Sequence, residues 1–150
     1  MTRTHRSESG GRPSEAGSDV IALGNRAHFT ARPELRDKLI SCFSTVLRCG
    51  PPASLVAPGL AEPILAFRFP NGGSVSIEFS ETALDEAAAR RGAWLEIQTD
   101  DPDGLKRRIL EAGLPRVEYA ATTTFYFAVP GGQVFGVIDQ RRLSGEIRKP

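Results

Sequence analysis

The sequence predicts an α+β fold built from two copies of one βαβββ unit. The main observation is a repeated hairpin, found at 65–79 (LAFRFPNGGSVSIEF) and again at 124–138 (TFYFAVPGGQVFGVI). Each copy alternates apolar and polar residues, which is typical of strands with one buried face, and Pro and Gly residues separate the two strands. The same order of elements precedes each hairpin: a strand, a helix and a weak strand. A repeated supersecondary unit constrains the fold more than any single motif.

The first unit begins with a strand at 25–31, in which Phe29 faces one side and His28 and Thr30 the other. Pro33 suits the first position of a helix, and apolar residues then recur at spacings of three and four as far as Gly50, which predicts about four helical turns. A short strand at 54–56 leads to the hairpin.

The second unit repeats this order after a connector. Residues 81–91 are expected to form a helix capped by Ser80 and ended by Gly92. The strand at 93–99 places two apolar residues on one face and three larger polar or aromatic residues on the other. A helix begins at Asp101-Pro102 and ends at Gly113, and a short strand at 116–119 precedes the second hairpin. The three residues on the polar face of the first strand are Trp94, Glu96 and Gln98.

These elements predict one domain between two tails. Residues 1–22 are polar and are expected to be disordered, residues 23–140 form the domain, and residues 141–150 form a polar tail. The domain divides into a first unit at 25–80, the connector helix at 81–91 and a second unit at 92–140.

Composition excludes several classes of function. The net charge of +1 provides no field for binding nucleic acid or an anionic membrane, and no apolar run is long enough to span a bilayer. Cys42 and Cys49 lie seven residues apart on one predicted helix, about 10 Å, which is too far for a disulfide. They indicate small core residues in a reducing compartment, so we expect a cytoplasmic protein.

The segments WLEIQTDDPDGLKRRILEAGLP and FYFAVPGGQVFGVI, within the doubled order of elements, resemble the vicinal oxygen chelate superfamily. This superfamily includes glyoxalase I, extradiol dioxygenases and bleomycin-resistance proteins. The resemblance implies two βαβββ modules whose sheets form an open curled sheet around a cleft. It also implies a homodimer and a divalent metal in the cleft, held by residues of the first and last strands of each module.

Carried over to this sequence, the metal-ligand positions fall on His28 and Glu78 in the first module. In the second module they fall on Trp94 and Gly136, and neither side chain can hold a metal. Glu96, two residues beyond Trp94 on the same face, could supply a displaced carboxylate.

Our leading hypothesis is therefore a small-molecule-binding protein of the bleomycin-resistance type, which sequesters a bulky or aromatic ligand without a metal or other cofactor. Trp94 would stack on the ligand, and four polar side chains would fix its polar groups. Tyr126 and Gly136 complete the expected cleft. The alternative is a divalent-metal-dependent lyase, isomerase or dioxygenase with His28 and Glu78 as ligands. A third possibility is a structural or regulatory module. The four polar side chains are His28, Glu78, Glu96 and Gln98.

Overall fold

The computed structural model describes residues 21–146, and it contains two four-stranded mixed sheets with helices, an α+β fold. The strand orders are β1-β4-β3-β2 and β5-β8-β7-β6, so each sheet repeats the arrangement of the other. The first and last strands of each module pair in parallel, and the other pairs are antiparallel. The strands are β1 (Arg26–Ala31), β2 (Ala53–Leu55), β3 (Ile64–Arg68), β4 (Ser74–Phe79), β5 (Leu95–Thr99), β6 (Arg116–Val117), β7 (Phe125–Ala128) and β8 (Val134–Asp139).

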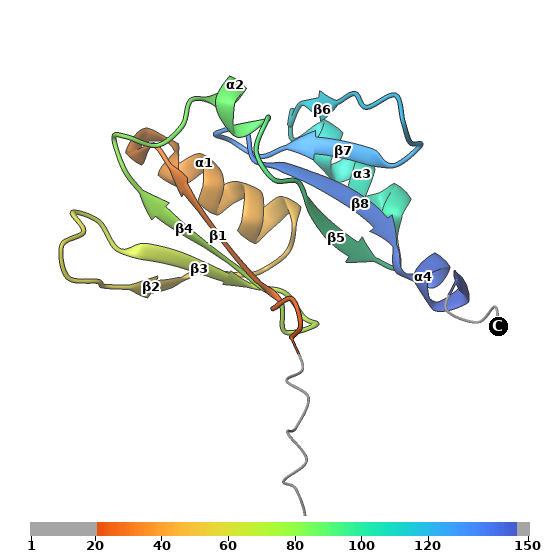
Figure 1. The fold of residues 1–150 in the computed structure, drawn as a ribbon, viewed down its shortest axis with the longest axis horizontal. Coiled ribbons are helices and arrows are strands. Elements are labelled where there is room, and N and C mark those ends of the chain that lie inside the picture. The colour runs from red at the N-terminus through yellow and green to blue at the C-terminus, as the bar shows by residue number, and fades with distance from the viewer. Residues whose placement is uncertain (1–20, 147–150) are drawn as a thin grey trace, which may run out of the picture.

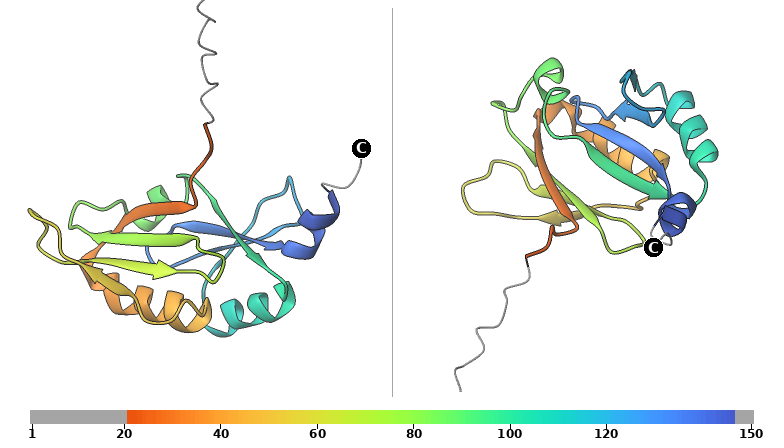
Figure 2. Two further views of the ribbon diagram at one scale, coloured as in Figure 1. Left: turned by 90° about the horizontal axis from the view of Figure 1, so that it is seen from below. Right: turned by 45° about the vertical axis from the view of Figure 1, so that its right-hand side comes forward.

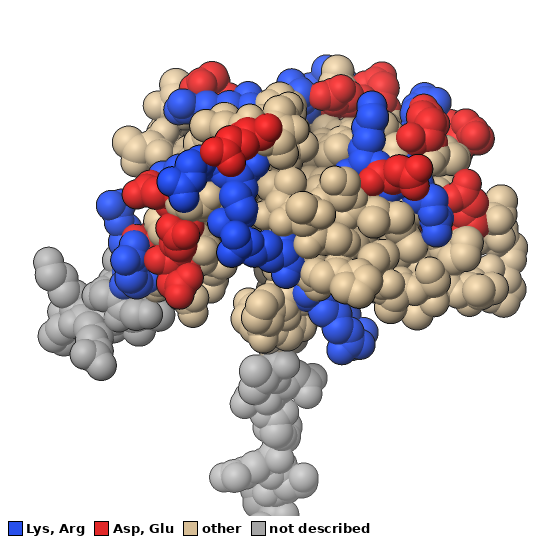
Figure 3. Space-filling model, turned by 180° about the vertical axis from the view of Figure 1, so that it is seen from behind, with Lys and Arg blue, Asp and Glu red and all other residues tan. Residues whose placement is uncertain are grey.

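Two helices lie in one layer behind the two sheets (Figure 1; Figure 2). The principal helices, α1 (Arg36–Ser41) and α3 (Pro102–Glu111), cover the same side of the molecule, and the opposite face of both sheets carries no helix (Figure 1; Figure 2). We call residues 25–80 module one, residues 92–140 module two, and the sheet face that points away from α1 and α3 the open face. Viewed from behind, the helix side shows both signs of charge and a broad uncharged area (Figure 3).

One hydrophobic core extends through both modules. The Phe43 ring stacks on Phe67 of module one, with ring centroids 4.9 Å apart, and its edge meets Phe135 of module two at 6.0 Å. The Arg108 Nε–H donates a hydrogen bond of 3.1 Å to the Val46 carbonyl, which ties α3 to the end of the first helix. The sequence repeat therefore forms two sheets but a single core.

The two predicted hairpins are present and match each other at an offset of 60 residues. Phe67 pairs with Val75 in module one, as Phe127 pairs with Phe135 in module two. The turns match as well, because the Phe69 amide donates to the Gly73 carbonyl at 2.8 Å and the Val129 amide donates to the Gln133 carbonyl at 3.0 Å. This offset gives each hairpin position of one module a counterpart in the other.

The first helix is less regular than its apolar spacing predicts. It begins as a 3-10 turn, η1 (Pro33–Leu35), continues as α1 and ends as a π-helical turn, η2 (Cys42–Val46). The Leu47 amide donates to the Cys42 carbonyl at 3.0 Å, a bond that spans five residues, and Arg48 then has a φ of 58°. A π turn holds one more residue than an α turn, which sequence periodicity alone does not distinguish.

The predicted connector helix over 81–91 is too long. The helix α2 (Glu86–Ala89) has only four residues, and its N-cap is Asp85, whose Oδ1 accepts from the Ala88 amide at 2.8 Å. Ser80 instead forms a local turn in which its Oγ accepts from the Thr82 amide at 3.2 Å. The first part of the connector follows this turn rather than a helix because a short hydroxyl side chain competes well for nearby backbone donors.

The structure describes only part of the two segments that were predicted to be tails. The helix α4 (Gln140–Glu146) occupies most of the segment expected to be a polar C-terminal tail. Residues 1–20 and 147–150 lie outside the described residues. Within residues 21–146, no helix is both long and apolar enough to cross a membrane.

Candidate functional site

Two predicted residues of module one meet on its open face. His28 Nε2 lies 3.5 Å from Glu78 Oε2, and His28 Nδ1 lies 2.8 Å from Ser76 Oγ. His28 is on β1, and Ser76 and Glu78 are on the neighbouring strand β4, where alternation turns Val75, Ile77 and Phe79 to the core. The imidazole is thus oriented between a hydroxyl and a carboxylate while its side chain remains 47% exposed.

Module two carries three aromatic rings at the corresponding face, Trp94, Tyr119 and Tyr126, which we call the aromatic trio. The Trp94 ring centroid lies 5.3 Å from Tyr119 and 4.9 Å from Tyr126, and the two tyrosine rings are 6.1 Å apart. These separations are typical of interacting aromatic side chains. The indole N–H of Trp94 donates to the Arg90 carbonyl at 2.9 Å, which fixes the ring at the start of β5.

Gly136 is what allows Tyr126 to take this position. A Cβ at residue 136 would lie 2.7 Å from Tyr126 Cε1 and 3.1 Å from Cδ1. The tyrosine ring therefore lies over the backbone of β8, where any side chain at 136 would collide with it. The sequence placed Gly136 and Tyr126 together in the expected cleft, and the Tyr126 ring fills the space above Gly136.

Tyr119 was not among the predicted site residues. Its sequence position suggested the end of a strand at 116–119, but β6 ends at Val117 and Tyr119 lies in the following loop, 50% exposed. Hydrophobic periodicity does not predict which way a loop side chain points. The one sequence feature that pointed to Tyr119 was an aromatic residue next to a short strand.

Strand register shows which residues of the two modules correspond. His28 pairs with Ser76 and Ser76 with Ala66, while Glu96 pairs with Gly136 and Gly136 with Tyr126. The counterpart of His28 is therefore Glu96, and the counterpart of Ser76 is Gly136. The counterpart of Glu78, by the 60-residue offset, is Ile138. The sequence-based assignment put the matching metal-ligand positions on Trp94 and Gly136, two residues before Glu96 and Ile138.

Glu96 and Gln98 are the remaining predicted residues, and both lie exposed on β5. Glu96 is in the same row as Gly136 and Tyr126, so its carboxylate is on the face that carries the aromatic trio. Gln98 follows two residues later, on the same face. Neither makes a side-chain contact with His28 or Glu78 among the described residues.

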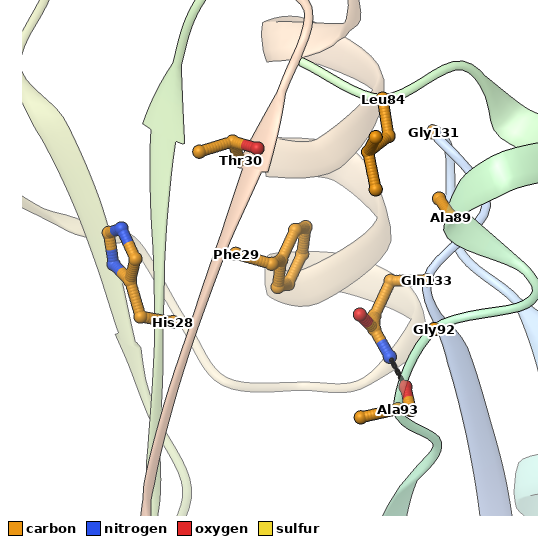
Figure 4. Close-up of a pocket in the computed structure, with 9 residues that line it drawn as sticks. All are labelled: His28, Phe29, Thr30, Leu84, Ala89, Gly92, Ala93, Gly131 and Gln133. Atoms are coloured by element: carbon orange, nitrogen blue, oxygen red, sulfur yellow. Dashed lines mark hydrogen bonds between the residues drawn. The ribbon is translucent and has the colours of Figure 1, made fainter.

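A cavity of about 340 Å³ lies between β1 and the segments of module two that approach it (Figure 4). The Phe29 ring projects toward module two, while the His28 and Thr30 side chains point to the other side of β1. On the far wall, the Gln133 side-chain amide donates to the Ala93 carbonyl at 2.6 Å. Ala93 directly precedes Trp94, so the cavity separates the histidine pair from the aromatic trio. Its remaining lining residues are Leu84, Ala89, Gly92 and Gly131.

A second, larger hollow of about 510 Å³ lies elsewhere, between α1, the end of α3 and the turn of the second hairpin. Its lining contains none of the predicted site residues. We assign the site to the open face because the paired polar residues and the aromatic trio are there, and volume alone does not identify a site.

The donors on the open face do not fit a chelated catalytic metal. His28 and Glu78 supply two donor groups, whereas a catalytic zinc site normally has three protein ligands. Within residues 21–146, no group of three or more His, Cys, Asp or Glu side chains is placed to hold a metal ion.

The fold resembles several solved structures. A protein assigned to the glyoxalase family from Bacillus anthracis has a TM-score of 0.58 and 15% identity over 81% of this chain and 97% of that chain. Glyoxalase I from Leishmania major has a TM-score of 0.64 and 10% identity, covering 85% and 93% of the two chains. TnmS3, an antibiotic binding protein from Streptomyces, has a TM-score of 0.53 and 19% identity, covering 80% and 98%.

These structures show that the chain has a glyoxalase-like fold, with its two sheets left open. No protein-family model matches the sequence, and no curated protein is similar to it. At identities below 25%, the likeness establishes the fold, so function must be argued from the side chains.

Proposed function

We propose that this protein binds a planar aromatic small molecule on the open face of its sheets and acts by sequestering it rather than by metal-assisted catalysis. The observation that carries the proposal is the aromatic trio, whose Tyr126 ring lies over Gly136. The trio lies at the surface, with Trp94 36% and Tyr119 50% exposed, so its rings remain available to a ligand. Stacked or edge-on aromatic contacts stabilise such a complex beyond the apolar area that they bury.

Polar side chains beside the trio would orient the ligand. Glu96 lies in the row of Gly136 and Tyr126, and His28 lies across the cavity with Ser76 and Glu78 as partners. A few polar groups in fixed positions around an apolar surface are typical of a small-molecule site. The likeness to TnmS3, whose description is an antibiotic binding protein, supports a binding role for this fold.

Fluorescence titration tests this proposal directly, because Trp94 is the single tryptophan of the chain. Planar aromatic compounds are titrated against wild-type protein and against Tyr126→Ala and Gly136→Ala. We expect quenching of Trp94 and a roughly 3- to 10-fold weaker affinity in either variant, since each removes one stacking partner from its place. Leu110→Ala, at a 55% exposed position on the back layer, is the control and should bind like wild type. Equal affinity in all four proteins would refute the proposed site.

Metal analysis separates this function from the alternative, a metal-dependent lyase, isomerase or dioxygenase. Protein purified without chelator is analysed for bound metal and then titrated with Mn²⁺, Fe²⁺, Ni²⁺ and Zn²⁺ while its thermal stability is measured. We expect no stoichiometric metal because the described donor set has only two members. A stoichiometric ion that is lost in both His28→Ala and Glu78→Ala would establish the alternative.

We also propose that the protein forms a homodimer. Both β1 and β5 are edge strands, paired only with β4 and β8 respectively within the described chain. Unpaired strand edges are surfaces on which a second chain can dock. Sedimentation equilibrium gives the mass of the particle and so decides between a monomer and a dimer.

A further inference from the structure

A row of three polar side chains crosses the open face of module one beyond the histidine pair. Arg26 on β1 and Arg68 on β3 both pair with Ser74 on the central strand β4. Strand alternation puts all three on the open face, because Ala27, Phe67 and Val75, the neighbours of these residues in the chain, contribute to the core. Two guanidinium groups therefore flank one hydroxyl, with one strand between them.

None of these three side chains has a partner within residues 21–146. The ion pairs of the described chain use other arginines, and neither Arg26 nor Arg68 is among them. The Ser74 hydroxyl makes no side-chain hydrogen bond there either, and both arginines are exposed. Two uncompensated guanidinium groups in one row attract anions, and their planar donors match the oxygens of a carboxylate or phosphate.

The next row extends the same polar surface. Ser76 and His28 follow along β4 and β1, and the third member of their row is Ala66, whose methyl group leaves space above the sheet. Glu78 is the acidic residue on this face, and it lies four residues along the strand from Ser74, roughly 13 Å away. Glu78 contacts His28, whose row lies between Glu78 and the arginine row.

We propose that Arg26, Ser74 and Arg68 bind an oxyanion, a carboxylate or phosphate group, carried by the ligand of the open face. The inference rests on the proposed function in one respect: the aromatic trio would hold the planar part of that ligand while the arginine row holds its anionic group. The ligand class becomes an aromatic compound with an anionic substituent.

Matched ligands test this inference. Trp94 fluorescence is used to compare an aromatic carboxylate, the corresponding aromatic phosphate ester and the uncharged amide of the carboxylate. Wild-type protein should bind at least one anionic compound roughly 5- to 10-fold more tightly than the amide, a modest ratio because the arginines are exposed. Arg26→Gln and Arg68→Gln should each reduce this preference and leave amide binding unchanged. Which anion binds better distinguishes carboxylate from phosphate recognition.

Arg107→Gln is the matched control, because it removes the same charge from an exposed position on α3, in the opposite layer. A preference for the anion that falls equally in Arg107→Gln would show general charge attraction and overturn the proposal. If the amide and both anions bind equally well to wild-type protein, the arginine row is not a ligand site, while the aromatic site stands.

A second measurement does not depend on aromatic binding. Inorganic phosphate is titrated into ¹⁵N-labelled protein at constant ionic strength, and the amide resonances are followed by NMR. We expect saturable shifts at Arg26, Arg68, Ser74 and Ser76, and their loss in the Arg26→Gln, Arg68→Gln double variant. No shifts, or shifts spread equally over the surface, would overturn the anion site. If phosphate binds but no aromatic compound does, the arginine row stands and the proposed function fails.

Discussion

Three positions make the open face of module two different from that of module one. Ala66, Ser76 and His28 form one row in module one, and the corresponding row in module two consists of Tyr126, Gly136 and Glu96. Module two thus has the Tyr126 ring where module one has the methyl group of Ala66, and the neighbouring position, Gly136, has no side chain. The two differences depend on each other because a Cβ at residue 136 would collide with the Tyr126 ring. The same backbone presents a polar surface in one module and an aromatic one in the other.

The two cysteines make the free energy of unfolding depend on pH in the alkaline range. Burial raises the pKa of the Cys42 thiol from 9.0 to about 12 and that of Cys49 to about 11. Above pH 9 the unfolded chain loses protons that the native chain retains, so the free energy of unfolding falls between pH 9 and about 11 to 12. The slope is at most about 1.4 kcal/mol per pH unit for each thiol, and less for Cys49, which is only partly buried.

Urea unfolding at pH 8, 9 and 10 measures this effect. Cys42→Ala, Cys49→Ala protein lacks both thiols, so its stability deficit relative to wild type should shrink as the pH rises. Other titrating groups are common to both proteins and cancel in the comparison. Parallel stability curves for the two proteins would show that the thiols ionise normally in the native state.

At residue scale, sequence reasoning named most residues of the candidate site and missed what depends on loops and exact register. It named His28 and Glu78, which do meet, and Trp94 and Tyr126, which do form a cluster. Alternation was sufficient because it fixes which face a strand residue occupies. Tyr119 was missed because its position depends on a loop. Strand register places the counterparts of His28 and Glu78 two residues beyond Trp94 and Gly136. A two-residue shift keeps the same face of the strand, so alternation does not reveal it before the pairing is known.

At the scale of elements, the two hairpin turns have different surroundings although their sequences match. Gly132 lies against α2, where a Cβ would overlap the Glu86 carbonyl oxygen and lie 3.0 Å from its Cα. Gly72, its counterpart, has a φ of +89° and nothing within 4 Å of the same position, while Gly132 has a φ of +98°. The second turn therefore supports the connector, and the first is free.

Alanine substitutions at the two turns measure this difference. Gly72→Ala should cost about 1 kcal/mol, the penalty of a positive φ for a residue with a Cβ. Gly132→Ala carries the same penalty plus the displacement of α2 backbone, so we expect a loss of about 2–4 kcal/mol. Urea denaturation of both variants gives the two values. Equal losses would mean that the connector does not pack tightly against the second turn.

The elements most strongly determined by local pattern were predicted best. Both hairpins were predicted because alternation, Pro and Gly-Gly all indicate the same structure. The length of the connector helix was overestimated because its alanines and arginines favour a helix. Its start is decided by Ser80, which forms a local turn, and by Asp85, which caps the helix. The π turn at the end of the first helix depends on tertiary packing around Phe43, which the sequence does not show.

At the scale of the whole molecule, the sheets are separate but the core is shared. Phe43 contacts Phe67 in its own module and Phe135 in the other, and Arg108 donates to Val46 across the same boundary. Ordering either module alone would leave one side of Phe43 without its partners. We therefore expect the domain to unfold in a single cooperative transition rather than one module at a time.

Phe43→Leu tests this coupling, because the substitution is in module one and the only tryptophan, Trp94, is in module two. Loss of ring contacts in a core site should lower the free energy of unfolding by about 1–3 kcal/mol. If the core is shared, the urea midpoint reported by Trp94 fluorescence falls together with the midpoint reported by far-ultraviolet circular dichroism. Leu110→Ala, a surface change, should leave both midpoints nearly unchanged. A Trp94 transition that keeps its wild-type midpoint in Phe43→Leu protein, while the circular dichroism midpoint falls, would mean that the modules fold independently. The cavity between them would then open and close without unfolding either sheet.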